Sequence, residues 1–217
     1  IMNVLELFSG TGSIGKVCEK LGWNAISVDL ELPATHECDI MDFDYKQYPK
    51  DYFSIVWASC PCVNYSRLKD CNLGRMVRGE IYTTERRDED MKKDDKLVIK
   101  TLEIINYFDP DVWFIENPAG SRMKDRPFMI DIDNYIVDYC MYSDWGYQKR
   151  TRIFTNKKDF SALLCNKNCG NIKDGRHLLT CDNGYDKRGI GKYNKGTTKL
   201  DRYRIPEDLI LSLFLDH

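Results

Sequence analysis

The chain has 217 residues, of which 42% are hydrophobic and 30% charged, and its formal net charge is −2. This composition is ordinary for one compact domain with, at most, a small appendage. No apolar run approaches the ~20 residues that a membrane-spanning helix needs, and we recognise no signal peptide.

Nine cysteines are many for this length, but the number is odd and most of them lie in apolar or motif-like segments. A disulfide framework is typical of short, loop-rich secreted chains instead. We therefore expect reduced thiols and an intracellular protein.

The charges are distributed unevenly along the chain. Residues 1–144 carry 17 Lys and Arg against 26 Asp and Glu, whereas residues 145–217 carry 15 against 8, a net charge of +7. A basic block on an acidic chain suits contact with a phosphate backbone, and Lys187 and Arg188 are candidate contacts. The alternative is a solvated basic face.

The first segment predicts a strand at residues 3–8, a glycine-containing turn at 9–13 and a helix over 14–21 that ends at Gly22. Glycine lets the backbone approach a ligand closely, and a helix N-terminus offers free N–H groups. The segment therefore resembles the opening of a nucleotide-type site.

Two acidic residues follow at the ends of the next expected strands. Residues 24–29 predict a second strand that ends in Asp29, where a ribose hydroxyl partner belongs in this class of fold. Residues 38–40 would close a third strand and bring Asp39 within reach of an adenine amino group. The alternative for either acid is a surface turn carboxylate.

The apolar run at residues 52–58 predicts a buried strand, and Cys60, Pro61 and Cys62 occupy the turn that follows it. Ligand chemistry in open α/β sheets lies at the carboxyl ends of strands. Cys62 is therefore a candidate nucleophile, because a thiolate is a strong one. The alternative is that Cys60 and Cys62 are small buried residues in a tight turn.

Residues 67–95 show no clean period, which predicts a long loop that acts as a lid. A helix is expected around residues 98–105, and a buried strand over 111–115 leads into Glu116, Asn117 and Pro118. Further strands are expected at residues 135–141 and 147–154. The second of these would place Gln148, Arg150 and Arg152 on one face.

Residues 156–200 are rich in Lys, Asn and Gly and have little periodicity. They contain four residues that could hold a structural zinc ion: Cys165, Cys169, His177 and Cys181. The spacing is not one of the standard zinc patterns, so unpaired cysteines in a loop-rich lobe are the alternative, and we assign no metal. The chain ends in an amphipathic helix after Pro206.

Four of these segments, taken in order, resemble the motifs of the cytosine-C5 DNA methyltransferases. Residues 7–12 are similar to the cofactor motif Phe-x-Gly-x-Gly, and residues 61–66 to the catalytic motif Pro-Cys-Gln-x-Phe-Ser. Residues 116–118 resemble Glu-Asn-Val, and residues 148–152 match Gln-x-Arg-x-Arg. The resemblance implies an α/β, Rossmann-like methyltransferase sheet with S-adenosylmethionine as methyl donor.

The resemblance also implies roles for individual residues. Cys62 would add to C6 of cytosine, Glu116 would hold or protonate N3, and Arg150 and Arg152 would orient the base and Glu116. The target base would be flipped out of double-stranded DNA. The implied cofactor site consists of Phe8, Ser9, Gly10, Thr11, Gly12, Asp29, Asp39 and Pro61.

We expect a catalytic domain over residues 1–155 and a small basic lobe over 156–204, which the resemblance interprets as a reduced target-recognition region. The apolar stripe of the last segment predicts a C-terminal helix over residues 205–217 that packs back on the catalytic domain, and we expect a monomer. Short forms with Glu-Asn-Pro resemble methyltransferases of phages and large DNA viruses.

The sequence departs from the family pattern at Val63, at Pro118 and in the absence of a Gly-Asn motif near the C-terminus. Two alternatives therefore stay open. One is a catalytically silent nucleic-acid-binding protein on the same scaffold, and the other is an RNA cytosine-C5 methyltransferase.

Overall fold

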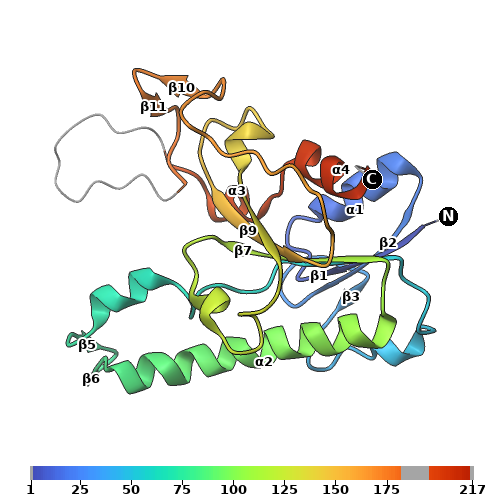
Figure 1. Cartoon of the computed structure of the whole chain (residues 1–217). Coiled ribbons are helices and arrows are strands. Elements are labelled where there is room, and N and C mark those ends of the chain that lie inside the picture. Colours follow the sequence, from blue (N-terminus) through green and yellow to red (C-terminus); the bar gives the residue numbers. More distant parts are fainter. Residues whose placement is uncertain (1, 182–195, 216–217) are drawn as a thin grey trace.

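The computed structural model describes residues 2–181 and 196–215, so Lys187 and Arg188 lie outside the described residues. Its centre is a seven-stranded sheet of strand order β3-β2-β1-β4-β7-β9-β8 (Figure 1). The strands are β1 (Asn3–Leu7), β2 (Asn24–Asp29), β3 (His36–Glu37), β4 (Ile55–Ala58), β7 (Val112–Pro118), β8 (Asn134–Asp138) and β9 (Arg150–Thr155).

The first five strands of this order run parallel, and β9 runs antiparallel to both β7 and β8. From β1 the chain moves outward through β2 to β3, and then returns to place β4 on the other side of β1. The carboxyl ends of β1 and β4 therefore flank the point where the strand order reverses, which is where ligands bind in open α/β sheets.

Helices cover both faces of the sheet, as Figure 1 shows. Helix α2 (Thr84–Phe108) packs against the face that carries Val56 and Ile115, whereas α1 (Ser13–Leu21) and α4 (Glu207–Leu215) pack against Trp57 and Phe114. Successive strand residues point to opposite faces. Because both faces are covered, the central strands are mostly apolar, and all four residues of β4 are buried.

The prediction of a long loop over residues 67–95 is wrong for the second half of this segment. Residues 67–81 hold a 3₁₀ helix, η2 (Arg67–Asn72), and the hairpin of β5 (Met76–Val77) and β6 (Glu80–Ile81), but α2 already begins at Thr84. The Thr83 side chain caps it by accepting a hydrogen bond from the Arg86 N–H (3.2 Å). The first turns of α2 are mostly exposed to solvent and carry few apolar residues. They therefore lack the apolar periodicity from which a helix is predicted.

The structure also revises the chain after β7. The strand expected at residues 135–141 ends at Asp138, and a 3₁₀ turn, η4 (Tyr139–Met141), follows it. The later segment holds the hairpin of β10 (Ile172–Lys173) and β11 (Arg176–His177) and helix α3 (Lys199–Tyr203). Two further 3₁₀ turns are η1 (Tyr45–Gln47) and η3 (Arg122–Asp125). None of the described helices is long and apolar enough to cross a membrane.

Candidate active site

The turn that leaves β4 separates its two cysteines. Cys60 is 4% exposed, and its sulfur lies 3.7 Å from the Thr101 hydroxyl of α2. Burial raises the pKa of the Cys60 thiol to about 12. Cys62 is only partly buried and lines a depression of about 420 Å³. Of the two thiols, only Cys62 is therefore placed to meet a substrate.

Helix α2 holds this turn in place through two buried carboxylates. Asp94 accepts hydrogen bonds from the backbone N–H (3.0 Å) and the side-chain amide (2.7 Å) of Asn64. Asp95 accepts from the Tyr65 hydroxyl (2.8 Å) and from Arg126 Nε (2.9 Å). These bonds fix the backbone on the C-terminal side of Cys62 to the helix below the sheet.

Strand β7 supplies the next two polar groups. The buried Asn117 donates from Nδ2 to the Cys60 carbonyl oxygen (3.0 Å), which joins the end of β7 to the β4 turn. Glu116 is 6% exposed, and its Oε1 accepts from the Tyr139 hydroxyl (3.0 Å) and from Lys149 Nζ (3.1 Å). No hydrogen bond between described residues uses Oε2, which leaves this oxygen for a substrate.

The strand register explains why Lys149, and neither nearby arginine, reaches Glu116. Glu116 pairs with Ile153 across β7 and β9, so residues 149, 151 and 153 share its face of the sheet. Arg150 instead binds Asp138 of β8 (2.9 and 2.7 Å), and Arg152 Nη1 donates to the Asn134 side chain. The roles of Arg150 and Arg152 toward the base stay predictions.

Sequence reasoning missed both Lys149 and Tyr139. Lys149 lies inside the recognised motif at a variable position, and strand alternation predicts only that it faces away from its two arginine neighbours. Tyr139 lies in a 3₁₀ turn that looked like a strand. No signal in the sequence connects either residue with Glu116.

The charges around Cys62 oppose one another. Burial raises the pKa of its thiol, the negative charge of Glu116 raises it further, and the Lys149 ammonium lowers it. The thiol is therefore protonated at neutral pH before a substrate binds. Lys149 is a cation that favours the thiolate.

The glycine turn after β1 has the features of a cofactor loop. Phe8 has a left-handed backbone (φ 55°), which a non-glycine residue rarely adopts and which is frequent at binding sites. The Gly10 N–H donates to Asp29 (2.8 Å), so the acid at the end of β2 also shapes the turn. The buried Ser9 Oγ has no partner among the described residues. An unsatisfied hydroxyl fits a loop that a ligand completes.

The two acidic candidates are both partly engaged by the backbone. Asp29 Oδ1 accepts from the N–H groups of Glu31 and Leu32 (both 2.9 Å), and Asp39 Oδ1 accepts from the Met41 N–H (2.9 Å). A carboxylate has about four acceptor positions, so each acid can still accept from a ribose hydroxyl or an adenine amino group.

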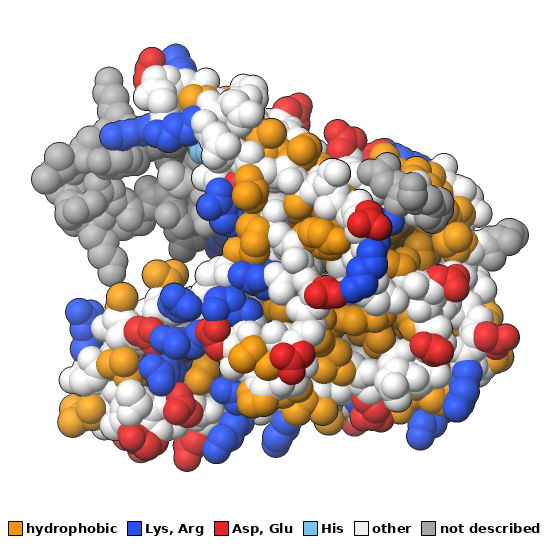
Figure 2. Space-filling view, in the orientation of Figure 1, with side chains coloured by type: hydrophobic (Ala, Val, Ile, Leu, Met, Phe, Trp, Pro, Cys, Tyr) orange, Lys and Arg blue, Asp and Glu red, His pale blue; other side chains and the backbone are white. Residues whose placement is uncertain are grey.

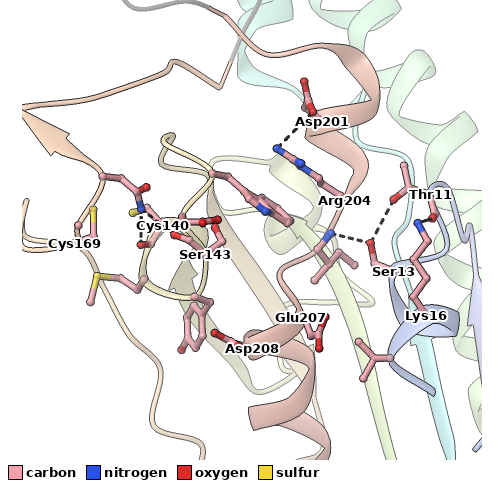
Figure 3. Close-up of a pocket in the computed structure, with 18 of the residues that line it drawn as sticks. Thr11, Ser13, Lys16, Cys140, Ser143, Cys169, Asp201, Arg204, Glu207 and Asp208 are labelled. Carbon is pink, nitrogen blue, oxygen red and sulfur yellow. Dashed lines mark hydrogen bonds and ion pairs between the residues drawn. The ribbon is translucent and has the colours of Figure 1, made fainter. Parts of the chain in front are cut away.

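A cleft lies beside this loop. It has a volume of about 990 Å³, and its lining includes Thr11 but none of Phe8, Gly10, Asp29 or Asp39. Figure 3 shows Thr11, Ser13 and Lys16 on one wall, with Cys140, Ser143 and Cys169 opposite. The expected cofactor residues therefore lie outside most of this cleft, toward β2 and β3.

Three of the four residues that the sequence offered as zinc ligands lie together in the structure, and a different cysteine takes the place of the fourth. Cys165, Cys169 and His177 come together, but the fourth residue of the cluster is Cys140 from η4 and not Cys181. Cys140 precedes Cys165 by 25 positions and lies in an apolar segment, so spacing alone could not include it.

The fold and the site together define a Rossmann-like α/β protein with a ligand loop after β1 and a thiol and a carboxylate at adjacent strand ends. The chain is 36% identical to a probable DNA (cytosine-5)-methyltransferase of Frog virus 3 (isolate Goorha), over 98% of each chain. The chain therefore belongs to the DNA (cytosine-5)-methyltransferase family.

No family model matches the chain. Among solved structures, a putative DNA modification methyltransferase encoded within a prophage of E. coli matches 91% of the chain, with a TM-score of 0.51 and 14% identity. The methyltransferase EhMeth of Entamoeba histolytica matches 76% of the chain with a TM-score of 0.49 and 16% identity. The chain spans 62% of the prophage protein and 55% of EhMeth, and the prophage match supports the fold.

Proposed function

We propose that the chain transfers a methyl group from S-adenosylmethionine to C5 of cytosine in double-stranded DNA through a covalent bond from Cys62. The observation that carries this proposal is the pairing of the Cys62 thiol with Glu116 at the ends of adjacent strands, where Glu116 is held by Tyr139 and Lys149. The viral relative, a probable DNA (cytosine-5)-methyltransferase, supports the same reaction.

The site residues would act on the base in a fixed order. The Cys62 thiol would release its proton to solvent, and its sulfur would bond to C6 while Glu116 Oε2 holds or protonates N3, so that the electron pair of the C5–C6 double bond becomes available at C5. C5 would then bond to the methyl carbon as the bond from this carbon to the sulfonium sulfur breaks, which leaves S-adenosylhomocysteine. Loss of the C5 proton to solvent would re-form the C5–C6 double bond as the bond from C6 to the Cys62 sulfur breaks, and Cys62 would leave as a thiolate.

S-adenosylmethionine supplies an electrophilic methyl group on a sulfonium sulfur when it is bound. The backbone of the Phe8–Gly12 turn and the Ser9 hydroxyl would hold it, with Asp29 toward the ribose and Asp39 toward the adenine. Pro61 and the buried Asn117, whose Oδ1 lacks a partner among the described residues, would border the methyl group.

A cytosine in duplex DNA hides C5 and C6 in the stack, so the base must be flipped out to reach Cys62. Figure 2 shows Lys and Arg side chains on the side of the molecule that carries η2 and the β5–β6 hairpin. Arg67, Arg75 and Arg78 of this segment are exposed, and they begin only five residues after Cys62. We propose that they bind the phosphates around a flipped base. The viral origin of the relative supports action inside a host cell.

The decisive experiment incubates the protein with labelled S-adenosylmethionine and separate DNA and RNA pools, followed by nucleoside analysis. We expect 5-methylcytosine in DNA, with its formation abolished by Cys62→Ser and retained by Cys60→Ser, the matched control. A 5-fluorocytosine duplex should trap a covalent adduct with the wild type and not with Cys62→Ser. Label in RNA alone would favour the RNA enzyme, and cofactor binding without label in either pool would favour the silent scaffold.

A further inference from the structure

A second cluster of reactive side chains lies at the junction between the sheet and the segment after β9. Its four members are Cys140, Cys165, Cys169 and His177, and their ligand atoms all lie within 4.8 Å of one another. Cys140 comes from η4 beside the sheet, and His177 comes from β11. Figure 3 shows Cys140 and Cys169 at one end of the cleft beside the glycine turn.

The distances between the ligand atoms of the cluster match those expected around a single metal ion. The Cys165 and Cys169 sulfurs are 3.6 Å apart, and His177 Nε2 lies 3.6 Å from the first and 3.4 Å from the second. Zinc binds sulfur at ~2.3 Å and imidazole nitrogen at ~2.0–2.1 Å, and tetrahedral angles then separate two sulfurs by about 3.8 Å and a sulfur from a nitrogen by about 3.6 Å. A single central ion would satisfy all three distances.

The backbone around the cluster is fixed by buried hydrogen bonds. Asn171 is 5% exposed, and its Nδ2 donates to the carbonyl oxygens of Cys140 (3.1 Å) and Ser143 (2.8 Å) while its Oδ1 accepts from the Gly146 N–H (3.1 Å). The Cys165 N–H donates to Asp138 (2.8 Å). Ligands are therefore brought together by a scaffold that does not depend on them.

The hairpin that carries His177 is shaped by its turn. Asp174 and Gly175 both have positive φ (51° and 74°), as the two central residues of a type I′ turn require. This turn pairs His177 with Ile172 and returns it toward Cys169. The imidazole thus reaches the sulfurs by a defined backbone route.

We propose that Cys140, Cys165, Cys169 and His177 bind one structural Zn²⁺ ion. Three thiolates and one imidazole fill a tetrahedral shell and leave no open position, which is typical of structural and not of catalytic zinc. The soft sulfur ligands favour zinc over magnesium or calcium, which take oxygen ligands.

The ion would join the segment after β9 to the catalytic sheet. Cys140 directly follows Tyr139, whose hydroxyl binds Glu116, and Asp138 one residue earlier binds both Arg150 and the Cys165 N–H. Loss of the ion would remove one of the constraints on η4, which carries one of the two groups that hold Glu116.

The test measures metal in the intact chain purified under reducing conditions. We expect one zinc per chain by mass spectrometry of the metal content, and thiolate-to-metal charge-transfer bands with tetrahedral d–d bands after exchange for Co²⁺. Removal of the ion with a chelator should lower the melting temperature, and added Zn²⁺ should restore it.

Variants assign the ligands. Cys169→Ser and His177→Ala should lose zinc, whereas His177→Cys should keep it, because a thiolate replaces the imidazole. Cys181→Ser and Cys71→Ser, outside the cluster, should retain one zinc per chain. The proposal is overturned if the folded wild type binds neither Zn²⁺ nor Co²⁺, or if Cys181→Ser removes the metal. It is also overturned if protein purified under reducing conditions contains a Cys165–Cys169 disulfide.

Discussion

At the scale of single residues, the reactivity of Cys62 depends on a balance between two opposite charges. Glu116 raises the pKa of the thiol and Lys149 lowers it, and burial keeps both effects strong. The same carboxylate that would bind N3 therefore slows thiolate formation in the free protein. A base bound to Glu116 in the proposed reaction would remove this conflict.

We predict that Glu116→Gln makes Cys62 more reactive while it disables methylation. Removing the negative charge lowers the pKa of the thiol, so iodoacetamide should alkylate Cys62 severalfold faster near neutral pH, whereas turnover should fall by about 10²-fold or more. Peptide mass spectrometry resolves Cys62 from the other thiols. Lys149→Gln is the matched control and should slow alkylation; equal rates in all three proteins would contradict the charge balance.

A second residue-scale prediction concerns Glu6, which is 2% exposed in β1 and accepts hydrogen bonds from the N–H groups of Ile14 (3.1 Å) and Gly15 (3.0 Å). Burial raises its pKa to about 7 from the ordinary 4.5. The folded chain thus holds this proton more tightly than the unfolded chain, and the resulting stability, present below pH ~4.5, is lost as pH rises through ~7.

The loss should amount to about 3 kcal/mol across that window. Denaturant unfolding at a series of pH values measures it, and Glu6→Gln should remove this part of the slope because the amide does not titrate. Glu19 is exposed on α1, the helix whose Ile14 and Gly15 N–H groups bind Glu6, and Glu19→Gln should leave the slope unchanged. A wild type and a Glu6→Gln variant with parallel pH profiles would refute the assignment.

At the scale of elements, the charged first half of α2 positions the catalytic turn. Asp94 and Asp95 are buried although they belong to a charged run, because Asn64, Tyr65 and Arg126 satisfy their oxygens. A carboxylate with this many partners is stable inside the protein. The helix therefore acts as a support for the turn as well as a cover for the sheet.

We predict that Asp94→Ala destabilises the fold by about 1–3 kcal/mol, since it leaves the Asn64 N–H and amide without their acceptor. The turn would loosen, so turnover should fall while binding of S-adenosylhomocysteine, measured by calorimetry, stays near the wild-type value. Glu89→Gln on the exposed side of α2 serves as the control. Full activity in Asp94→Ala would show that the turn is held by other contacts.

At the scale of the whole molecule, charge and not shape complementarity is expected to control association with DNA. The near-neutral total of −2 conceals a net +7 over residues 145–217, and exposed arginines at η2 and the β5–β6 hairpin add positive charge near Cys62. Counterion release makes such binding depend steeply on salt.

We predict that the double variant Arg75→Ala, Arg78→Ala weakens DNA binding about equally across sequences and lowers the salt slope by roughly 2. Fluorescence anisotropy at several salt concentrations measures both quantities, and S-adenosylhomocysteine binding should not change. Lys46→Ala is the control, because it removes an exposed cation of η1, where the neighbouring Tyr45 packs against Phe108 at the C-terminal end of α2. An unchanged slope would place the DNA elsewhere on the surface.

The sequence by itself determined the parts of this protein that depend on local patterns. The strands at β1, β2, β4 and β7, helix α1 with its glycine stop, and the order of four motifs all follow from apolar periodicity and turn chemistry within short windows. The sequence alone therefore identified the candidate site residues Cys62 and Glu116 and the Phe8–Gly12 turn.

The tertiary structure decided which side chains meet. Strand register placed Lys149 beside Glu116 and turned Arg150 and Arg152 to the other face, and a 3₁₀ turn brought Tyr139 onto the same carboxylate. Cys140, and not Cys181, joins Cys165, Cys169 and His177, because the chain at Cys165 lies beside the end of β8, where the Cys165 N–H donates to Asp138. Such contacts join residues far apart in the chain, and their geometry depends on packing and register, which local propensity does not encode.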